Sequence, residues 1–125
     1  MADVTVKRLD DFDSSFGGAF KLVRHGLGVE SFGIQVIDMP PNADQYPEHD
    51  HSEDGQEEVY TVLEGSATLT VDGEEHKLEP GVFARVPAGH KRKIITASAP
   101  VRLLALGGVP GKAYEAPEFS KPAAA

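Results

Sequence analysis

Two histidines one residue apart, His49 and His51, are the residues of this chain best placed to do chemistry together. In an extended segment, residues i and i+2 point to the same side, and two rises of ~3.3 Å separate their Cα atoms by about 6.6 Å. Two imidazoles at that spacing can converge on one metal ion, and a carboxylate such as Glu58, after a short polar loop, can add a third ligand. Mixed nitrogen and oxygen ligands suit Fe, Mn, Ni, Cu or Zn better than Ca or Mg. The segment therefore predicts a divalent transition metal within β structure, and it names no reaction and no catalytic residue.

The segments that must position these residues have the pattern of short strands separated by turns. Six runs have this character: 32–36, 58–63, 67–71, 82–86, 93–96 and 101–106. Asp72-Gly73 predicts a tight hairpin, because both turn positions tolerate positive φ. We find no long stretch with the apolar period of a helix, and short strands at ~8–12-residue spacing are typical of a barrel or a sandwich.

Length and composition set further limits. A chain of 125 residues suits one domain, and it contains no cysteine, so disulfides and thiolate ligands are excluded. The net charge of −8 opposes nucleic-acid binding, no apolar run reaches the ~18 residues of a membrane span, and the first residues lack the pattern of a signal peptide. We therefore expect a cytoplasmic protein without nucleic-acid or membrane partners. Residues 1–106 are expected to form the domain, with an N-terminal strand, and residues 107–125 a Gly-, Pro- and Ala-rich tail that wraps the surface or frays.

Two glycine-bearing motifs resemble those of a known family. Gly65 lies seven positions after Glu58, and Gly81 is followed after five residues by Pro87-Ala88-Gly89. Together with the two histidines, this resembles the paired motifs of small single-domain cupins (the cupin type-2 conserved barrel family), over roughly residues 34–106. The resemblance implies an all-β fold with little helix, a double-stranded β-helix or jelly-roll-like antiparallel barrel. It does not imply one function, because cupins include dioxygenases, isomerases, sugar epimerases and storage proteins.

The chain departs from the family pattern at the last metal ligand and in one loop. The family places a histidine five positions after the motif proline, where this chain has Arg92, and His90 stands two residues earlier. Either His90 is the fourth ligand, which gives the set His49, His51, Glu58 and His90, or Arg92 replaces the histidine. A guanidinium cannot ligate a metal, since it stays protonated. The loop 52–57 is also two or three residues longer than usual; its acidic residues Glu53, Asp54 and Glu57 are interpreted as a solvated turn in preference to a lid.

Tyr60 and Arg92 are the candidate lining of a substrate pocket. Tyr60 shares the strand face of Glu58, and positions 90 and 92 face one side in an extended strand. The planar fork of Arg92 suits a carboxylate, so a small anionic ligand is expected. In the competing interpretation Arg92 pairs with Glu58 or Glu57 and closes an empty pocket.

The sequence thus predicts a metal-binding cupin of undetermined specificity, with a metal-dependent oxidoreductase acting on a small organic molecule as its enzymatic interpretation. The alternatives are a non-catalytic small-molecule-binding cupin and a metal-free structural one. A homodimer is expected because short strands leave edges that need covering, and the alternating segment Val4-Thr5-Val6 could pair across the subunit boundary.

Overall fold

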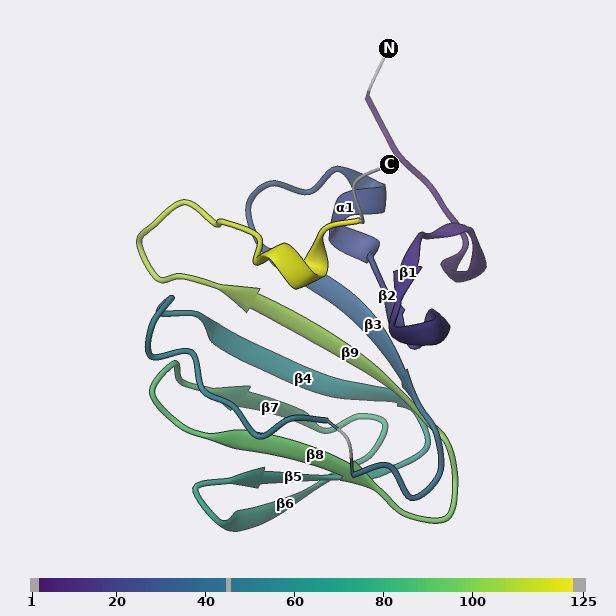
Figure 1. The fold of residues 1–125 in the computed structure, drawn as a ribbon, viewed down its shortest axis with the longest axis vertical. Coiled ribbons are helices and arrows are strands. Elements are labelled where there is room, and N and C mark those ends of the chain that lie inside the picture. The colour runs from purple at the N-terminus through teal and green to yellow at the C-terminus, as the bar shows by residue number, and fades with distance from the viewer. Residues whose placement is uncertain (1–2, 45, 123–125) are drawn as a thin grey trace.

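The computed structural model describes residues 3–44 and 46–122, and within them the chain forms two antiparallel sheets with little helix (Figure 1). The larger sheet has the order β1-β2-β3-β9-β4-β7 and the smaller one the order β6-β5-β8. The strands are β1 (Ser14–Ser15), β2 (Phe20–Lys21), β3 (Gly33–Met39), β4 (Glu57–Glu64), β5 (Ala67–Val71), β6 (Glu74–Leu78), β7 (Phe83–Val86), β8 (Arg92–Thr96) and β9 (Val101–Gly108). The helical elements are η1 (Leu9–Asp11), η2 (Phe16–Gly18), α1 (Val23–Leu27) and η3 (Glu118–Ser120).

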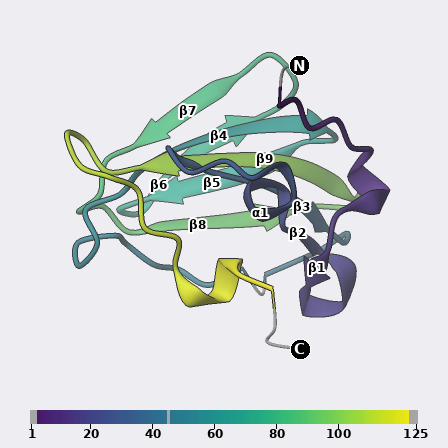
Figure 2. The ribbon, with the colours of Figure 1, turned by 90° about the horizontal axis from the view of Figure 1, so that it is seen from above.

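The expected all-β fold is confirmed, but its two sheets do not form a closed barrel. Figure 2 looks down on the fold and shows β7 and β4 on one side of it and β8 on the other. The two sheets are hydrogen-bonded separately, so they face each other as a jelly roll and do not close into one continuous barrel. No helix among the described residues is long and apolar enough to cross a membrane.

Strand alternation determines which side chains meet between the sheets. Tyr60 of β4 and Leu103 of β9 point inward from the larger sheet, and Leu69 of β5 and Ile94 of β8 point inward from the smaller one; all four are fully buried. Burying an aliphatic or aromatic side chain of this size stabilises the fold by about 1.5–3 kcal/mol. The core therefore fixes β4 and β8, the two strands that carry Glu58 and Arg92.

The turns follow the sequence closely. Asp72 and Gly73 have φ of 50° and 83°, so the hairpin between β5 and β6 uses the left-handed conformation expected of both residues. The tail beyond β9 returns over the start of β3, where a Cβ on Gly33 would meet the Tyr114 hydroxyl at 2.6 Å, and Ser120 is buried. At Tyr114 and Ser120 this segment therefore lies against the rest of the fold.

The N-terminal segment pairs with no strand among the described residues of the single chain, so its pairing across a subunit boundary stays a prediction. Residues 3–8 have no regular secondary structure, and Val4 and Val6 are 72% and 87% exposed. β1, which begins at Ser14, is the first strand among the described residues. A strand over Val4-Thr5-Val6 would need a pairing partner that the part of the chain described by the structure does not offer.

Candidate metal centre

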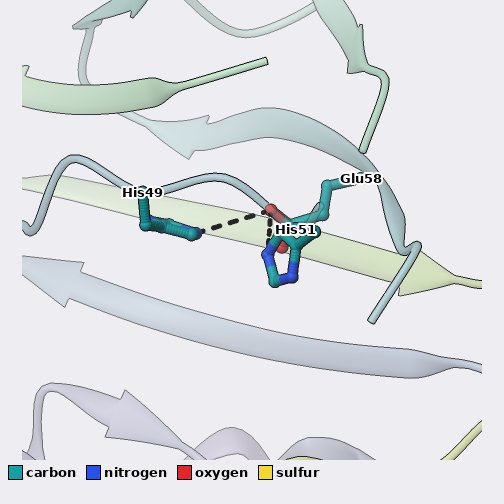
Figure 3. A group of neighbouring side chains, drawn as sticks. All are labelled: His49, His51 and Glu58. Atoms are coloured by element: carbon teal, nitrogen blue, oxygen red, sulfur yellow. Dashed lines mark ion pairs between the residues drawn. The ribbon is translucent and has the colours of Figure 1, made fainter. Parts of the chain in front are cut away.

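Three side chains from two segments, His49, His51 and Glu58, converge on one another (Figure 3). His49 lies in a loop that is bridged to β8, since its amide donates to the Arg92 carbonyl (3.0 Å) and its carbonyl accepts from the Arg92 amide (2.8 Å). The amide of His51 donates to the carbonyl of Ala88 (2.8 Å). Glu58 is the second residue of β4. The loop therefore lays both imidazoles over Glu58, and one ligand atom from each of the three side chains lies within 4.8 Å of the others.

Both imidazoles present Nε2 to the carboxylate. Nδ1 of His49 lies 2.9 Å from the carbonyl oxygen of Pro47, and Nδ1 of His51 lies 3.0 and 3.1 Å from the two carboxylate oxygens of Asp54. The carbonyl of Pro47 can only accept a hydrogen bond, and so can the carboxylate of Asp54 in its ionised form. In the neutral imidazoles Nδ1 therefore carries the proton and Nε2 keeps its lone pair. The Nε2 atoms of His49 and His51 lie 3.8 and 2.9 Å from Oε1 of Glu58.

The donor set fits a divalent transition metal. Nε2 of His51 is buried and makes no hydrogen bond, although Oε1 of Glu58 lies 2.9 Å away. An unpaired buried lone pair costs free energy that a metal ion would recover. Two ligands bound at about 2.1 Å and at right angles are about 3 Å apart, which is close to the observed separation of His51 and Glu58.

The Glu58 carboxylate is held by two further donors. The Tyr60 hydroxyl and Nη1 of Arg92 each donate to Oε1 at 2.5 Å. Burial opposes ionisation of Glu58, but the contacts from His49, His51 and Tyr60 outweigh it, so its pKa lies well below the ordinary value. The same carboxylate raises the pKa of His51. Glu58 is therefore an anion at neutral pH, the form that ligates a metal.

Arg92 occupies the position where the family pattern has its last histidine. Its side chain is fully buried; besides Glu58 it donates from Nε to the His90 carbonyl (3.0 Å) and from Nη2 to the Pro87 carbonyl (2.6 Å). These three contacts hold the guanidinium against the Glu58 carboxylate. The sequence left open whether Arg92 faces a ligand or pairs with an acidic residue, and the structure shows the ion pair with Glu58.

The structure does not bring His90 into this group. Residues 87–90 form a turn in which the His90 amide approaches the Pro87 carbonyl (3.4 Å), so the i, i+2 rule for an extended strand does not apply to positions 90 and 92. The imidazole of His90 is half exposed, and its Nδ1 lies 2.5 Å from a carboxylate oxygen of Asp72 in the β5–β6 turn. The group of potential ligands among the described residues therefore has three members.

Two contributors were missed by the sequence interpretation. Asp54 contacts His51, although the sequence predicts that the acidic loop 52–57 is solvated. Tyr46 lies in an irregular segment without periodicity; its ring lies 5.6 Å from that of His49, and burial raises its pKa. Burial likewise raises the pKa of Tyr60, whose position beside Glu58 agrees with the predicted shared face.

An all-β jelly roll with a histidine–carboxylate group at one end defines the class of protein. The family model for the cupin domain matches residues 35–107, more than half of the chain. The chain therefore belongs to the cupin family.

Comparison with individual proteins extends this likeness to the whole fold. The crystal structure of a cupin protein from Bacteroides fragilis has a TM-score of 0.72 and 21% identity, covering 100% of this chain and 99% of that one. The crystal structure of a cupin-superfamily sugar phosphate isomerase from Silicibacter pomeroyi has a TM-score of 0.70 and 25% identity, covering 83% of this chain and 75% of that one. Vicilin C72 of Gossypium hirsutum is 33% identical over 72 residues, which are 53% of this chain and only 12% of vicilin.

Proposed function

We propose that this cupin binds a divalent transition metal through His49, His51 and Glu58 and acts as a metal-dependent oxidoreductase on a small organic molecule. The orientation of the two imidazoles carries the proposal, since both Nδ1 atoms are engaged by acceptors and both Nε2 atoms face an ionised carboxylate. Two histidines and one carboxylate with open positions are the ligand pattern of non-haem Fe(II) oxygenases, so iron is the first metal to test. Mn, Ni, Cu and Zn accept the same donors.

The residues around the ligands serve binding and orientation. A bound ion would polarise a substrate oxygen or activate O₂ or water. His49 is the most exposed of the three ligands, with 30% of its side chain accessible against 12% for His51 and 14% for Glu58, so a ligand enters beside it. Tyr60 and Arg92 both donate to the Glu58 carboxylate and would hold it in place toward a bound ion.

The charges of the site support an anionic substrate. Arg92 cancels the charge of Glu58, so a bound divalent ion would keep a net positive charge, reduced by Asp54 behind His51, until an anion enters. Arg92 is buried and engaged through Nε, Nη1 and Nη2, so the attraction acts through the metal rather than through direct contact with the guanidinium. Small carboxylates belong in the substrate screen, and so do sugar phosphates, because the similar protein from Silicibacter pomeroyi is a sugar phosphate isomerase.

Metal retention by matched variants tests the proposal. Metal-free protein is loaded separately with Fe(II), Mn(II), Ni(II), Cu(II) and Zn(II), freed of excess by gel filtration, and analysed for metal. Wild type is expected to retain a stoichiometric amount of at least one metal, and His49→Ala and Glu58→Ala to lose it. His76→Ala removes an exposed imidazole from β6 and serves as the control. Full retention by His49→Ala would overturn the ligand assignment. Oxygen consumption with a panel of organic acids and sugar phosphates then tests the oxidoreductase activity.

A metal-free, non-catalytic cupin is the second candidate function. The observation in its favour is the ion pair between Arg92 and Glu58, which neutralises the carboxylate without a metal. This candidate predicts that none of the five metals is retained by wild type and that none raises its melting temperature.

A further inference from the structure

The loop between His51 and β4 is longer than in the family pattern, and hydrogen bonds hold it against the site. The amide of Gly55 donates to the carbonyl of His51 (2.7 Å), and Gly55 adopts a φ of +74°, a conformation that glycine adopts without strain. This turn brings residue 54 back over the imidazole of His51. Both carboxylate oxygens of Asp54 then lie within 3.1 Å of Nδ1 of His51.

Asp54 is itself held in place from the other side. Its Oδ1 accepts from the amide of Gln56 (3.1 Å) and its Oδ2 from the side-chain amide of Gln56 (3.1 Å). Gln56 is only 5% exposed, and its side-chain oxygen lies against Gly107 of β9, where an added Cβ would meet it at 2.8 Å. The contacts therefore run from the body of the larger sheet through Gln56 and Asp54 to the imidazole.

We infer that Asp54 is a positioning residue of the metal site, supplied by the longer loop of this chain: it fixes the Nδ1–H tautomer and the ring orientation of His51 so that Nε2 faces the metal. This inference deepens the proposed function, since it rests on His51 being a ligand. A carboxylate that accepts from the second nitrogen of a ligating histidine also raises the basicity of the first. Loss of such a partner weakens metal binding by about 10- to 100-fold.

The acidic neighbour Glu53 provides the matched control. Glu53→Ala removes one negative charge from the same loop, as Asp54→Ala does, and Glu53 has no hydrogen bond or ion pair through its side chain among those found within the described residues. Asp54→Asn keeps one side-chain oxygen that can accept from Nδ1 and tests whether acceptance, rather than charge alone, is needed.

The tautomer of His51 in metal-free protein is the readout that a merely structural role would not change. Long-range ¹H–¹⁵N spectra of the imidazoles are recorded at alkaline pH, where neutral histidines predominate, and His51 is assigned with His51→Ala. Wild type, Glu53→Ala and Asp54→Asn are expected to hold the proton on Nδ1, and Asp54→Ala to populate the Nε2–H form. An unchanged tautomer in Asp54→Ala would overturn the inference.

Calorimetric titration with Mn(II) adds the effect on affinity. Asp54→Ala is expected to bind Mn(II) about 10- to 100-fold more weakly, and Glu53→Ala to stay within about threefold of wild type, because a solvent-exposed charge contributes little. An equal loss in both variants would mean that only the charge of the loop matters and would overturn the role of Asp54. If wild type binds no metal at all, the proposed function fails, while the tautomer spectra still decide whether Asp54 orients His51.

Discussion

The buried arginine beside the ligands leads to a counterintuitive prediction: Arg92→Gln binds metal more tightly than wild type. Nη1 of Arg92 lies 2.5 Å from Oε1 of Glu58. Because a metal–carboxylate bond is about 2.0–2.2 Å, an ion on that oxygen lies within about 4.7 Å of Nη1. Glutamine removes the positive charge and keeps an N–H group that can donate to the carboxylate.

The repulsion should outweigh what Arg92 contributes by orienting Glu58. A divalent ion and a unit charge about 4.7 Å apart repel by about 7 kcal/mol at an effective dielectric constant of 20. A charge-assisted hydrogen bond to the carboxylate contributes about 1.5–3 kcal/mol. Delocalisation of the guanidinium charge and access of solvent beside His49 reduce the first figure, so we expect a net gain of at least about 1.4 kcal/mol, or tenfold in Kd.

Calorimetric titration of metal-free Arg92→Gln with Mn(II) or Co(II) measures this change. The matched control is Arg85→Gln, which removes the same charge from an exposed side chain that pairs with Glu57. The metal-free Arg92 variant should also unfold more easily, by about 3 kcal/mol, since breaking a buried ion pair leaves the remaining charge unpaired. If Arg92→Gln keeps its circular dichroism spectrum and binds metal no more tightly than wild type, the charge argument is refuted.

Three further predictions follow from individual contacts. His90→Ala should retain as much metal as wild type, because the imidazole pairs with Asp72 at the surface; metal loss in elemental analysis would restore His90 as a ligand. Burial raises the pKa of both Tyr46 and Tyr60, so above about pH 10 the unfolded chain releases protons that the folded chain keeps, and the free energy of unfolding falls as pH rises. Phenolate absorbance should therefore appear together with unfolding; a reversible step of all tyrosines near pH 10 in folded protein would refute this. We also propose that the chain forms a homodimer through the β7 edge, where Phe83 is 71% exposed, and light scattering that gives the monomer mass of 13.4 kDa would count against it.

The fold and the three central residues could be predicted because they depend on local pattern. Alternation placed Tyr60 beside Glu58 and set them on one face of β4, and the positive φ preference of Asp72 and Gly73 located the hairpin. Each of these inferences uses only the geometry of a strand or a tight turn. The same reasoning also offered the pairing of Arg92 with Glu58 as one of two alternatives.

The remaining parts of the site lie in turns and loops, whose conformation cannot be predicted from strand or helix periodicity. His90 is turned outward because residues 87–90 form a turn before β8 begins. The expectation that positions 90 and 92 face one side holds only in an extended strand. Asp54 reaches His51 only because the loop folds back at Gly55, and a run of acidic residues looks the same whether it is solvated or folded back. Val4 and Val6 alternate like strand residues, but no strand formed by residues 3–44 and 46–122 pairs with them.

Anomalous diffraction from crystals soaked with Mn(II) or Co(II) tests the central claim most directly. We predict a single strong anomalous peak between His49 and His51, at about 2.0–2.2 Å from both Nε2 atoms and from the carboxylate of Glu58. A peak at the exposed pair of His90 and Asp72, or no peak while Arg92 stays paired with Glu58, would contradict it.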